Sequence, residues 1–115
     1  MAAFAFPRSA RLLRRAEFVA VKQGGRGFAE GPLAASYRPG GAAVRVGLTV
    51  SSKVGGAVVR NGVKRRLREA VRHELAALPP VDLVIVARAS ATRASVAEFR
   101  SWLQRASARI RKECA

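Results

Sequence analysis

The residues best suited to chemistry lie in one basic stretch of the sequence, VVRNGVKRRLREAVRHE, which runs from Val58 to Glu74. It holds six Arg or Lys residues between Arg60 and Arg72. On a helical wheel, polar and basic side chains of this stretch share an arc about 100° wide: Asn61, Lys64, Arg65, Arg68 and Arg72. Guanidinium and ammonium groups on one face are suited to bind phosphates, so the arc predicts contacts with a polyanion.

The charges of this stretch are not balanced within its own helix. Its only acidic residues, Glu69 and Glu74, fall outside the arc, whereas a solvated helix normally mixes the two signs of charge. Arg60 falls inside the apolar stripe, so we expect it to project beyond the core at the first turn. A helix N-terminus also favours anions, and Gly55 and Gly56 in front of it allow another backbone to approach closely.

The composition of the whole chain supports a polyanionic partner. Its 115 residues carry 22 basic and 7 acidic side chains, a net charge of +15, which repels itself in the compact state. The possible partners are nucleic acid, an anionic membrane surface or an acidic protein, and a merely solvated helix face is a fourth interpretation. Arginine, 18 of the 22 basic residues, favours nucleic acid because its planar fork fits phosphates and base edges. No aromatic residue lies beside the arc to anchor it on a membrane.

The sequence offers little for catalysis by the protein itself. The acidic residues are scattered and form no carboxylate cluster for two metal ions. We interpret His73 as a surface residue rather than a general base, and Cys114 stands alone, without a disulfide framework or zinc cluster. We therefore predict no catalytic residue and no metal ligand in this chain, and a reducing cytoplasm as its setting.

Periodicity and breakers predict the elements that position these residues. The arc lies on a long helix from about Ala57 to Leu78, which Pro79 and Pro80 end. A short helix over residues 14–23 ends at two glycines, and a last helix follows the capping box of Ser95 and Glu98. We expect one domain over residues 1–115, with residues 1–12 flexible when no RNA is bound.

The strands frame the long helix. PLAASYR is one candidate strand, and DLVIVARA reads as a strand buried on both faces. Between them, Val44, Val46, Leu48 and Val50 point one way and Arg45, Gly47, Thr49 and Ser51 the other, which predicts one face in a core and one face open. A strand, a crossover helix and another strand indicate a parallel pair, so the pattern predicts a small α/β sandwich.

The stretch RVGLTVSSKVGGAVVRNGVKRRLREAVR resembles the signature of the protein subunit of bacterial ribonuclease P. That family has a strand ending in a Val-Ser-x-Lys-like segment, a glycine-containing loop, and a helix with Arg-Asn-Arg-x-x-Lys-Arg-x-x-Arg-like spacing. FPRSARLLRRAEFVAV and DLVIVARASA resemble its N-terminal segment with first helix and its last strand. The resemblance implies an α-β-β-β-α-β-α two-layer sandwich with a small mixed sheet and a left-handed β-α-β crossover.

The resemblance also implies a function. The catalyst in this family is an RNA that holds magnesium ions, and the protein is its accessory subunit in removing the 5′ leader of precursor tRNA. We therefore expect ribonuclease P RNA and precursor tRNA as partners, no cofactor bound by the protein, no membrane and no obligate protein partner. A ribosomal protein or an RNA chaperone shares the charge and size and is the alternative, although the spacing from Lys53 to Arg68 argues against it.

Two sets of site residues follow. Contacts to the catalytic RNA are expected from Arg60, Asn61, Lys64, Arg65, Arg68 and Arg72. The resemblance also implies a separate groove for the single-stranded leader, with Phe18, Arg45, Ser51, Lys53 and Arg88. Such a groove would combine basic side chains with an aromatic platform, as single-strand binding requires. An aromatic residue on a short amphipathic helix is usually a core residue, so only the resemblance assigns Phe18 to the leader.

The sequence departs from the family pattern at three positions. Gly62 replaces a usual Arg, Ser52 replaces a residue that is often basic, and Lys22 replaces a residue that is often aromatic. Gly62 removes a phosphate contact and weakens the helix, and Lys22 removes a second stacking platform, for which Phe28 or Tyr37 could compensate.

Overall fold

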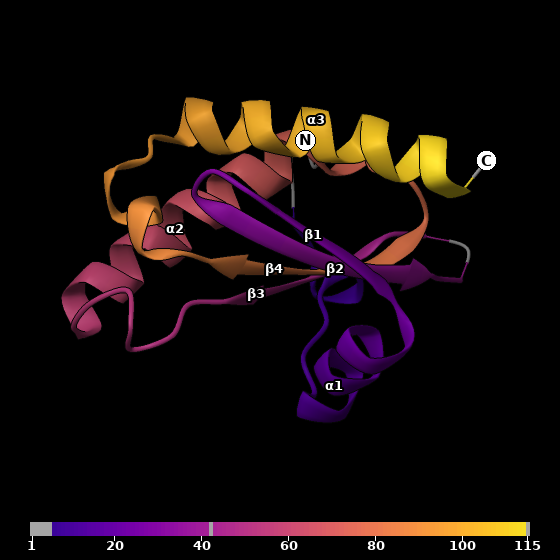
Figure 1. The fold of residues 1–115 in the computed structure, drawn as a ribbon, viewed down its shortest axis with the longest axis horizontal. Helices are drawn as coiled ribbons and strands as arrows, with labels where there is room; N and C mark the ends of the chain where they lie inside the picture. The colour runs from indigo at the N-terminus through magenta and orange to yellow at the C-terminus, as the bar shows by residue number, and fades with distance from the viewer. Residues whose placement is uncertain (1–5, 42, 115) are drawn as a thin grey trace.

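The computed structural model of this chain describes residues 6–41 and 43–114 (Figure 1). The helices and strands are α1 (Arg15–Gly24), β1 (Arg26–Glu30), β2 (Leu33–Pro39), β3 (Arg45–Thr49), α2 (Ala57–Glu74), β4 (Val81–Ala87) and α3 (Val96–Cys114). Short 3-10 turns are η1 (Arg8–Ala10), η2 (Leu75–Ala77) and η3 (Ala89–Arg93). This order confirms the α-β-β-β-α-β-α arrangement that the resemblance implies.

The described strands form one mixed sheet in the order β1-β2-β4-β3. β2 is antiparallel to both β1 and β4, whereas β3 runs parallel to β4. The parallel pair is joined by α2, as the sequence predicts, because parallel neighbours need a long crossover. The left-handed sense of that crossover stays a prediction.

The main core lies between the sheet and the helices α2 and α3, with α3 lying over the sheet at the top of Figure 1. Residues three and four apart on each helix face inwards, as the helical period requires; they are Val63, Leu67, Ala70 and Val71 on α2, and Phe99, Trp102, Leu103, Ala106 and Ile110 on α3. The capping box predicted for α3 is present, because Ser95 Oγ accepts the N–H of Glu98 at 3.1 Å and Glu98 Oε1 accepts the N–H of Ser95 at 3.1 Å.

A second, smaller cluster lies between the opposite face of the sheet and α1, which is below the sheet in Figure 1. Leu12, Val21 and Val84 are buried there, and Phe18 and Val86 pack against them. The sequence predicts that this face of β3 is open, and at Gly47 that prediction is wrong. Gly47 is buried beneath the Phe18 ring, so the helix α1 closes this part of the face.

The segment before α1 covers the outer edge of β3. Arg11 forms a parallel bridge with Val46, and the Leu12 N–H donates to the Val46 carbonyl at 3.0 Å. The Arg11 guanidinium donates twice to the Phe6 carbonyl, at 2.8 and 3.0 Å, and lies 4.7 Å from the centre of the Phe6 ring. The backbone pairing with Val46 covers part of an edge that would otherwise be unpaired. Residues 1–5 lie outside the described residues, and the flexibility expected of residues 1–12 stays a prediction.

Three details differ from the sequence expectations. The α-helical part of the long helix ends at Glu74 and tightens into η2 before Leu78, as helix ends commonly do. Val59, which the wheel places on the apolar stripe, has 43% of its surface exposed because it lies in the first turn, beyond the core. The strand β1 has no clear alternation of its own, and only the resemblance indicates it.

Candidate nucleic-acid interface

The predicted arc of α2 is a solvent-facing ridge, which we define as Asn61, Lys64, Arg65 and Arg68. Asn61, Arg65 and Arg68 are exposed and Lys64 is half-buried. Among the residues that the structure describes, no carboxylate pairs with any of these three cations. The first turn of α2 also lacks an acidic residue. The wheel predicts this solvent-facing position correctly, and phosphate binding by the ridge stays a prediction.

Arg60 lies beside the ridge in a different environment. It is half-buried, and its Nε is buried with no hydrogen-bond partner among the described residues. A buried donor without a partner is uncommon in folded proteins. A contact between Arg60 and the catalytic RNA stays a prediction.

Arg72, unlike the cations of the ridge, is paired with a carboxylate. Both Nε and Nη2 donate to the Glu69 carboxylate at 2.8 Å, and His73 Nε2 lies 3.1 Å from the same group. The Arg72 hydrogen bond lowers the pKa of Glu69, and that of Arg72 is raised by the same bond. The expectation that no acidic residue neutralises the arc is therefore wrong at Arg72, because a side chain three residues away reaches it.

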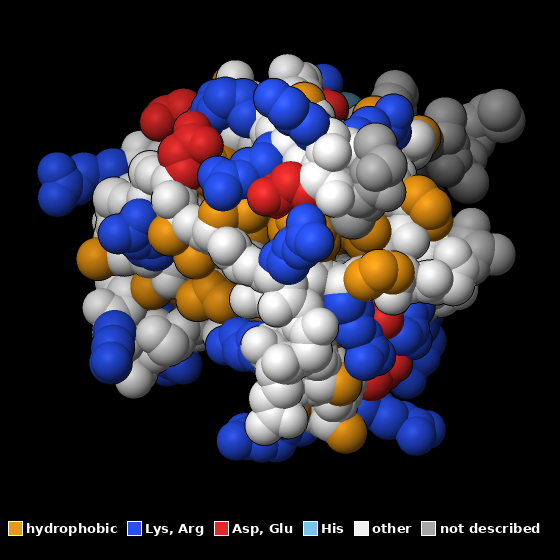
Figure 2. Space-filling view, turned by 45° about the vertical axis from the view of Figure 1, so that its right-hand side comes forward, with side chains coloured by type: hydrophobic (Ala, Val, Ile, Leu, Met, Phe, Trp, Pro, Cys, Tyr) orange, Lys and Arg blue, Asp and Glu red, His pale blue; other side chains and the backbone are white. Residues whose placement is uncertain are grey.

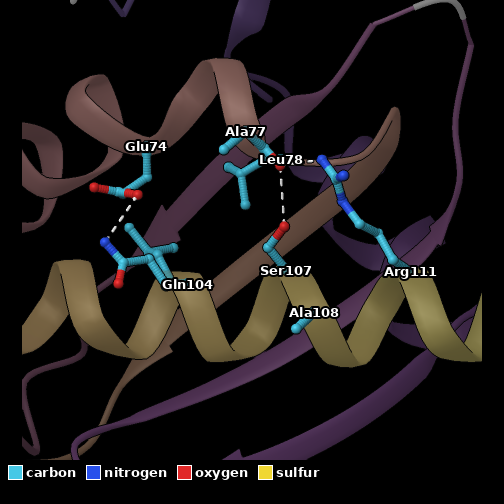
Figure 3. Close-up of a pocket in the computed structure, with 8 residues that line it drawn as sticks. Glu74, Ala77, Leu78, Gln104, Ser107, Ala108 and Arg111 are labelled. Atoms are coloured by element: carbon cyan, nitrogen blue, oxygen red, sulfur yellow. Dashed lines mark hydrogen bonds between the residues drawn. The ribbon is translucent and has the colours of Figure 1, made fainter.

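Glu74, the other acidic residue of the stretch, is buried and faces α3. It accepts from Arg100 at 2.8 Å and from Gln104 at 3.3 Å. Figure 3 shows it at one end of a cavity of about 430 Å³ between the end of α2 and α3, where Ser107 donates to the Ala77 carbonyl. None of the predicted site residues lines this cavity.

Arg66 has a structural role that the sequence analysis missed. Its guanidinium donates to the carbonyl oxygens of Ala94 at 3.1 Å and Thr92 at 3.2 Å. These carbonyls belong to η3 and the residue after it, which follow Arg88 at the end of β4. Arg66 therefore holds this turn against α2. In the sequence, the only feature that distinguishes Arg66 from the ridge residues is its position outside the arc of the helical wheel.

A hollow of about 140 Å³ brings the two predicted site sets together. Phe18 lines it with Lys64 and Arg68 of the ridge, and Arg11 adds a third cation. Its floor is apolar: Phe6, Leu12, Leu13, Val46 and Leu48. The expectation that the ridge and the groove are separate surfaces is therefore wrong for Lys64 and Arg68. Phe18 is half-buried, so it is both a packing residue and a wall of the hollow.

Three other predicted groove residues, Ser51, Lys53 and Arg88, follow the neighbouring C-terminal ends of β3 and β4. Thr49 pairs with Val86, so the parallel strands β3 and β4 end side by side. Ser51 and Lys53 follow β3 and Arg88 follows β4, and all three are exposed. The Arg88 guanidinium donates to the Gly31 carbonyl at 3.2 Å, which ties it to the turn between β1 and β2.

Phe28 and Tyr37 cannot replace an aromatic at Lys22. Tyr37 is 1% exposed, and Phe28 stacks on Trp102 with ring centres 5.8 Å apart. Both belong to the face of the sheet that α3 covers, because Tyr37 lies in the main core and Phe28 packs against that core and Trp102 of α3. The compensation suggested by the sequence is therefore wrong, and Lys22 is exposed on α1.

Arg45 is engaged by two acidic residues. Nε and Nη2 donate to the two oxygens of Asp82 at 3.1 Å each, and Nη1 donates to Glu17 at 2.6 Å. Hydrogen bonding to Asp82, more than to Glu17, raises the pKa of Arg45. The pKa of Glu17 is lowered, mainly because its carboxylate accepts the backbone N–H groups of Arg14 and Leu13. A contact between Arg45 and the leader stays a prediction.

The electrostatic surface is dominated by cations. On the face drawn in Figure 2, Lys and Arg side chains are spread from the α3 side at the top to the α1 side at the bottom, and at the lower right they surround acidic ones. Within residues 6–41 and 43–114, no group of three His, Cys, Asp or Glu side chains is placed to hold a metal ion. No helix in the same ranges is long and apolar enough to cross a membrane.

The fold and this surface define a small basic α+β protein of the nucleic-acid-binding class. A family model described as Ribonuclease P matches residues 6–111. The chain is 40% identical to the ribonuclease P protein component of Citrifermentans bemidjiense over 111 residues, 96% of both chains. It is 43% identical to that of Xanthomonas oryzae over 96 residues, which are 83% of this chain and 66% of the relative. The chain belongs to the ribonuclease P protein family.

Solved structures of the family share the fold. The RNase P protein of Staphylococcus aureus superposes with a TM-score of 0.77 at 25% identity, covering 90% of this chain and 95% of that one. The RNase P protein of Thermotoga maritima gives a TM-score of 0.77 at 27% identity, with coverage of 86% and 96%. These matches confirm the fold class expected from the sequence. As a member of this family, the chain is a protein component of a tRNA-processing ribonuclease, and ribonuclease P RNA is its partner.

Proposed function

We propose that this chain assists a catalytic ribonuclease P RNA in removing the 5′ leader of precursor tRNA, and that it holds the RNA through the α2 ridge and the leader through the adjoining hollow. The observation that carries the proposal is the shared wall of Phe18, Lys64 and Arg68. It combines an aromatic face, on which a base can stack, with cations that hold phosphates.

The ridge is the part that would contact the catalytic RNA. Lys64, Arg65 and Arg68 are cations that no described carboxylate neutralises, and Asn61 adds a neutral donor and acceptor beside them. Arg60 is proposed to contribute from the first turn. Arg72 would contribute only where RNA displaces Glu69, because both donors that face Glu69 are already used.

The leader would leave the hollow at Phe18 and run towards the C-terminal ends of β3 and β4, which Ser51, Lys53 and Arg88 follow. A strand in this path would meet few groups that read bases, because beyond the buried Gly47 the face presents Thr49 and Val86. Binding would therefore depend mainly on phosphates and stacking, and would tolerate many leader sequences.

The chemistry is proposed to reside in the RNA, which holds the magnesium ions, and the protein would supply no catalytic residue. We place this activity in the cytoplasm. The alternative of a ribosomal protein or RNA chaperone predicts no preference for a leader and no effect on cleavage.

Salt dependence tests the ridge. If the ridge and its neighbours neutralise ~6–10 phosphates, affinity for the RNA subunit should fall by about 10³–10⁵ between 50 and 200 mM salt. Arg65→Ala should reduce the slope of log affinity against log salt by roughly 0.7–0.9. Lys112→Ala, which removes an exposed charge from the last turn of α3, is the matched control and should leave the slope unchanged. Equal effects of the two substitutions would contradict the assignment of the ridge.

A further inference from the structure

The ion pairs of Arg45 join three elements at one point. Arg45 opens β3 and stands opposite Asp82 of β4 in the parallel register. Two of its nitrogens meet the Asp82 carboxylate at 3.1 Å each, and the third meets Glu17 Oε2 at 2.6 Å. The other Glu17 oxygen accepts the N–H groups of Leu13 and Arg14, at 3.2 and 3.1 Å. One guanidinium therefore connects both parallel strands to the first turn of α1.

Burial shows how strongly this arrangement is fixed. The side chain of Asp82 is 6% exposed, against 25% for Glu17 and 37% for Arg45. A buried carboxylate must keep its partner, because an unpaired buried charge is strongly unfavourable. The nearest other cation, Arg38, lies 3.6 Å away at its Nε. If Arg45 moved to a phosphate, Asp82 would lose two hydrogen bonds of 3.1 Å and keep only the ion pair with Arg38 at 3.6 Å.

The residue after Glu17 is Phe18, whose ring lies over Gly47, two positions beyond Arg45 on the same face of β3. A Cβ atom at Gly47 would lie 2.6 Å from Cε2 and Cζ of the ring. The ion pair and the ring contact are thus consecutive attachments of α1 to one strand. Loss of the first would allow the N-terminal turn of α1, and the ring with it, to shift over the sheet.

We propose that Arg45 is a positioning residue, which acts with Glu17 and Asp82 to hold α1 so that Phe18 stands at the wall of the leader-binding hollow. The proposal rests on the proposed function for its RNA readout, but its structural part concerns the free protein. Arg45 then contributes to leader binding through Phe18 and not through a phosphate contact of its own.

Direct contact and positioning predict effects of opposite sign for Glu17→Gln. If Arg45 contacts the leader, this substitution removes a competing negative charge and frees one donor, so the leader-bearing precursor should bind more tightly. If Arg45 positions α1, the same substitution weakens its attachment and the precursor should bind less tightly. In either case Asp82 still pairs with Arg45, so the buried carboxylate of Asp82 retains its partner in the variant.

Glu98→Gln is the matched control. Glu98 is exposed, also accepts a backbone N–H at the start of a helix, and pairs with no cation among the described residues. Each substitution removes one negative charge and leaves an amide oxygen that can still accept the backbone N–H at the start of its helix. The two variants differ in the helix that they affect, since Glu98 belongs to α3 on the other face of the sheet.

Two measurements test the proposal. In free protein, amide hydrogen exchange in α1 should rise about tenfold for Glu17→Gln and stay unchanged for Glu98→Gln. In protein assembled with the RNA subunit, Glu17→Gln should weaken leader-bearing precursor tRNA about tenfold and leave mature tRNA unchanged. Tighter or equal precursor binding by Glu17→Gln would overturn the positioning role, as would unchanged exchange in α1. If wild-type protein binds both tRNAs equally, the proposed leader site itself fails, while the exchange result still decides whether the ion pair holds α1.

Discussion

The contact between Phe18 and Gly47 allows a quantitative test of how α1 is seated. In Gly47→Ala, the new Cβ would lie 2.6 Å from two ring carbons of Phe18 and 3.1 Å from Cβ of Leu12. Carbon atoms pack at roughly 3.5–4.0 Å, so the ring must withdraw by about 1 Å or swing towards solvent. Overpacking of this kind typically costs about 1–3 kcal/mol of unfolding free energy, which lowers Tm by roughly 4–12 °C in a domain of this size.

Urea denaturation of four variants checks this reasoning: Gly47→Ala, Gly24→Ala, Phe18→Leu and the double variant Phe18→Leu/Gly47→Ala. Gly24→Ala is the control, because a Cβ there meets nothing within 4 Å, and it should be neutral or stabilising by up to about 1 kcal/mol. In a Phe18→Leu background the two clashing ring carbons are gone, so adding Gly47→Ala should cost less than about 1 kcal/mol, a measurable coupling. The same cost of Gly47→Ala in both backgrounds would refute the contact, and an unchanged affinity for leader-bearing precursor would refute the placement of Phe18 at the leader.

Three further predictions follow from particular contacts. Gly62→Arg should raise affinity for the RNA subunit and steepen the salt dependence of binding by roughly one phosphate contact. It should also stabilise α2 by up to ~1 kcal/mol, because a Cβ there comes no closer than 3.4 Å to Arg66. Weaker RNA binding in a filter-retention assay would contradict this. Arg66→Ala should destabilise the fold by about 1–3 kcal/mol in urea, because the partly buried carbonyls of Thr92 and Ala94 lose their donor. An unchanged urea midpoint would contradict this structural role of Arg66. The pKa of Glu17 is lowered in the folded state, so the ionised carboxylate contributes its full stabilisation above the ordinary pKa of 4.5 and loses it as the pH falls through the lowered pKa. The difference in unfolding free energy between wild type and Glu17→Gln should therefore be present at pH 7 and vanish in acid. A difference that does not depend on pH would contradict the ion pair.

Local patterns were sufficient to predict much of the fold and the ridge. The helical wheel placed Lys64, Arg65 and Arg68 on a solvent face because that period depends only on spacing within one helix. The buried strand β4 and the crossover α2 followed from composition and breakers in the same way. The wheel failed at Arg72, since it treats residues as angles and omits the reach of a carboxylate three positions away.

Contacts between distant segments were beyond such patterns. The pairing of Arg45 with Asp82 depends on the register of β3 against β4, across 37 residues of sequence. The closed face at Gly47 depends on where α1 returns to the sheet, and alternation along β3 alone made that face look open. The joining of ridge and groove at one hollow likewise required the relative placement of α1 and α2, which neither helix encodes alone.

Leader release at low magnesium tests the central claim most directly. Purified protein, the cognate ribonuclease P RNA and precursor tRNA are combined, and each component is also omitted in turn. We expect cleavage at the mature 5′ end by the RNA with protein, at a magnesium concentration where the RNA alone is nearly inactive, and no cleavage by the protein alone. Robust cleavage by RNA-free protein, or no gain in cleavage when the protein is added to its RNA, would contradict the proposed function.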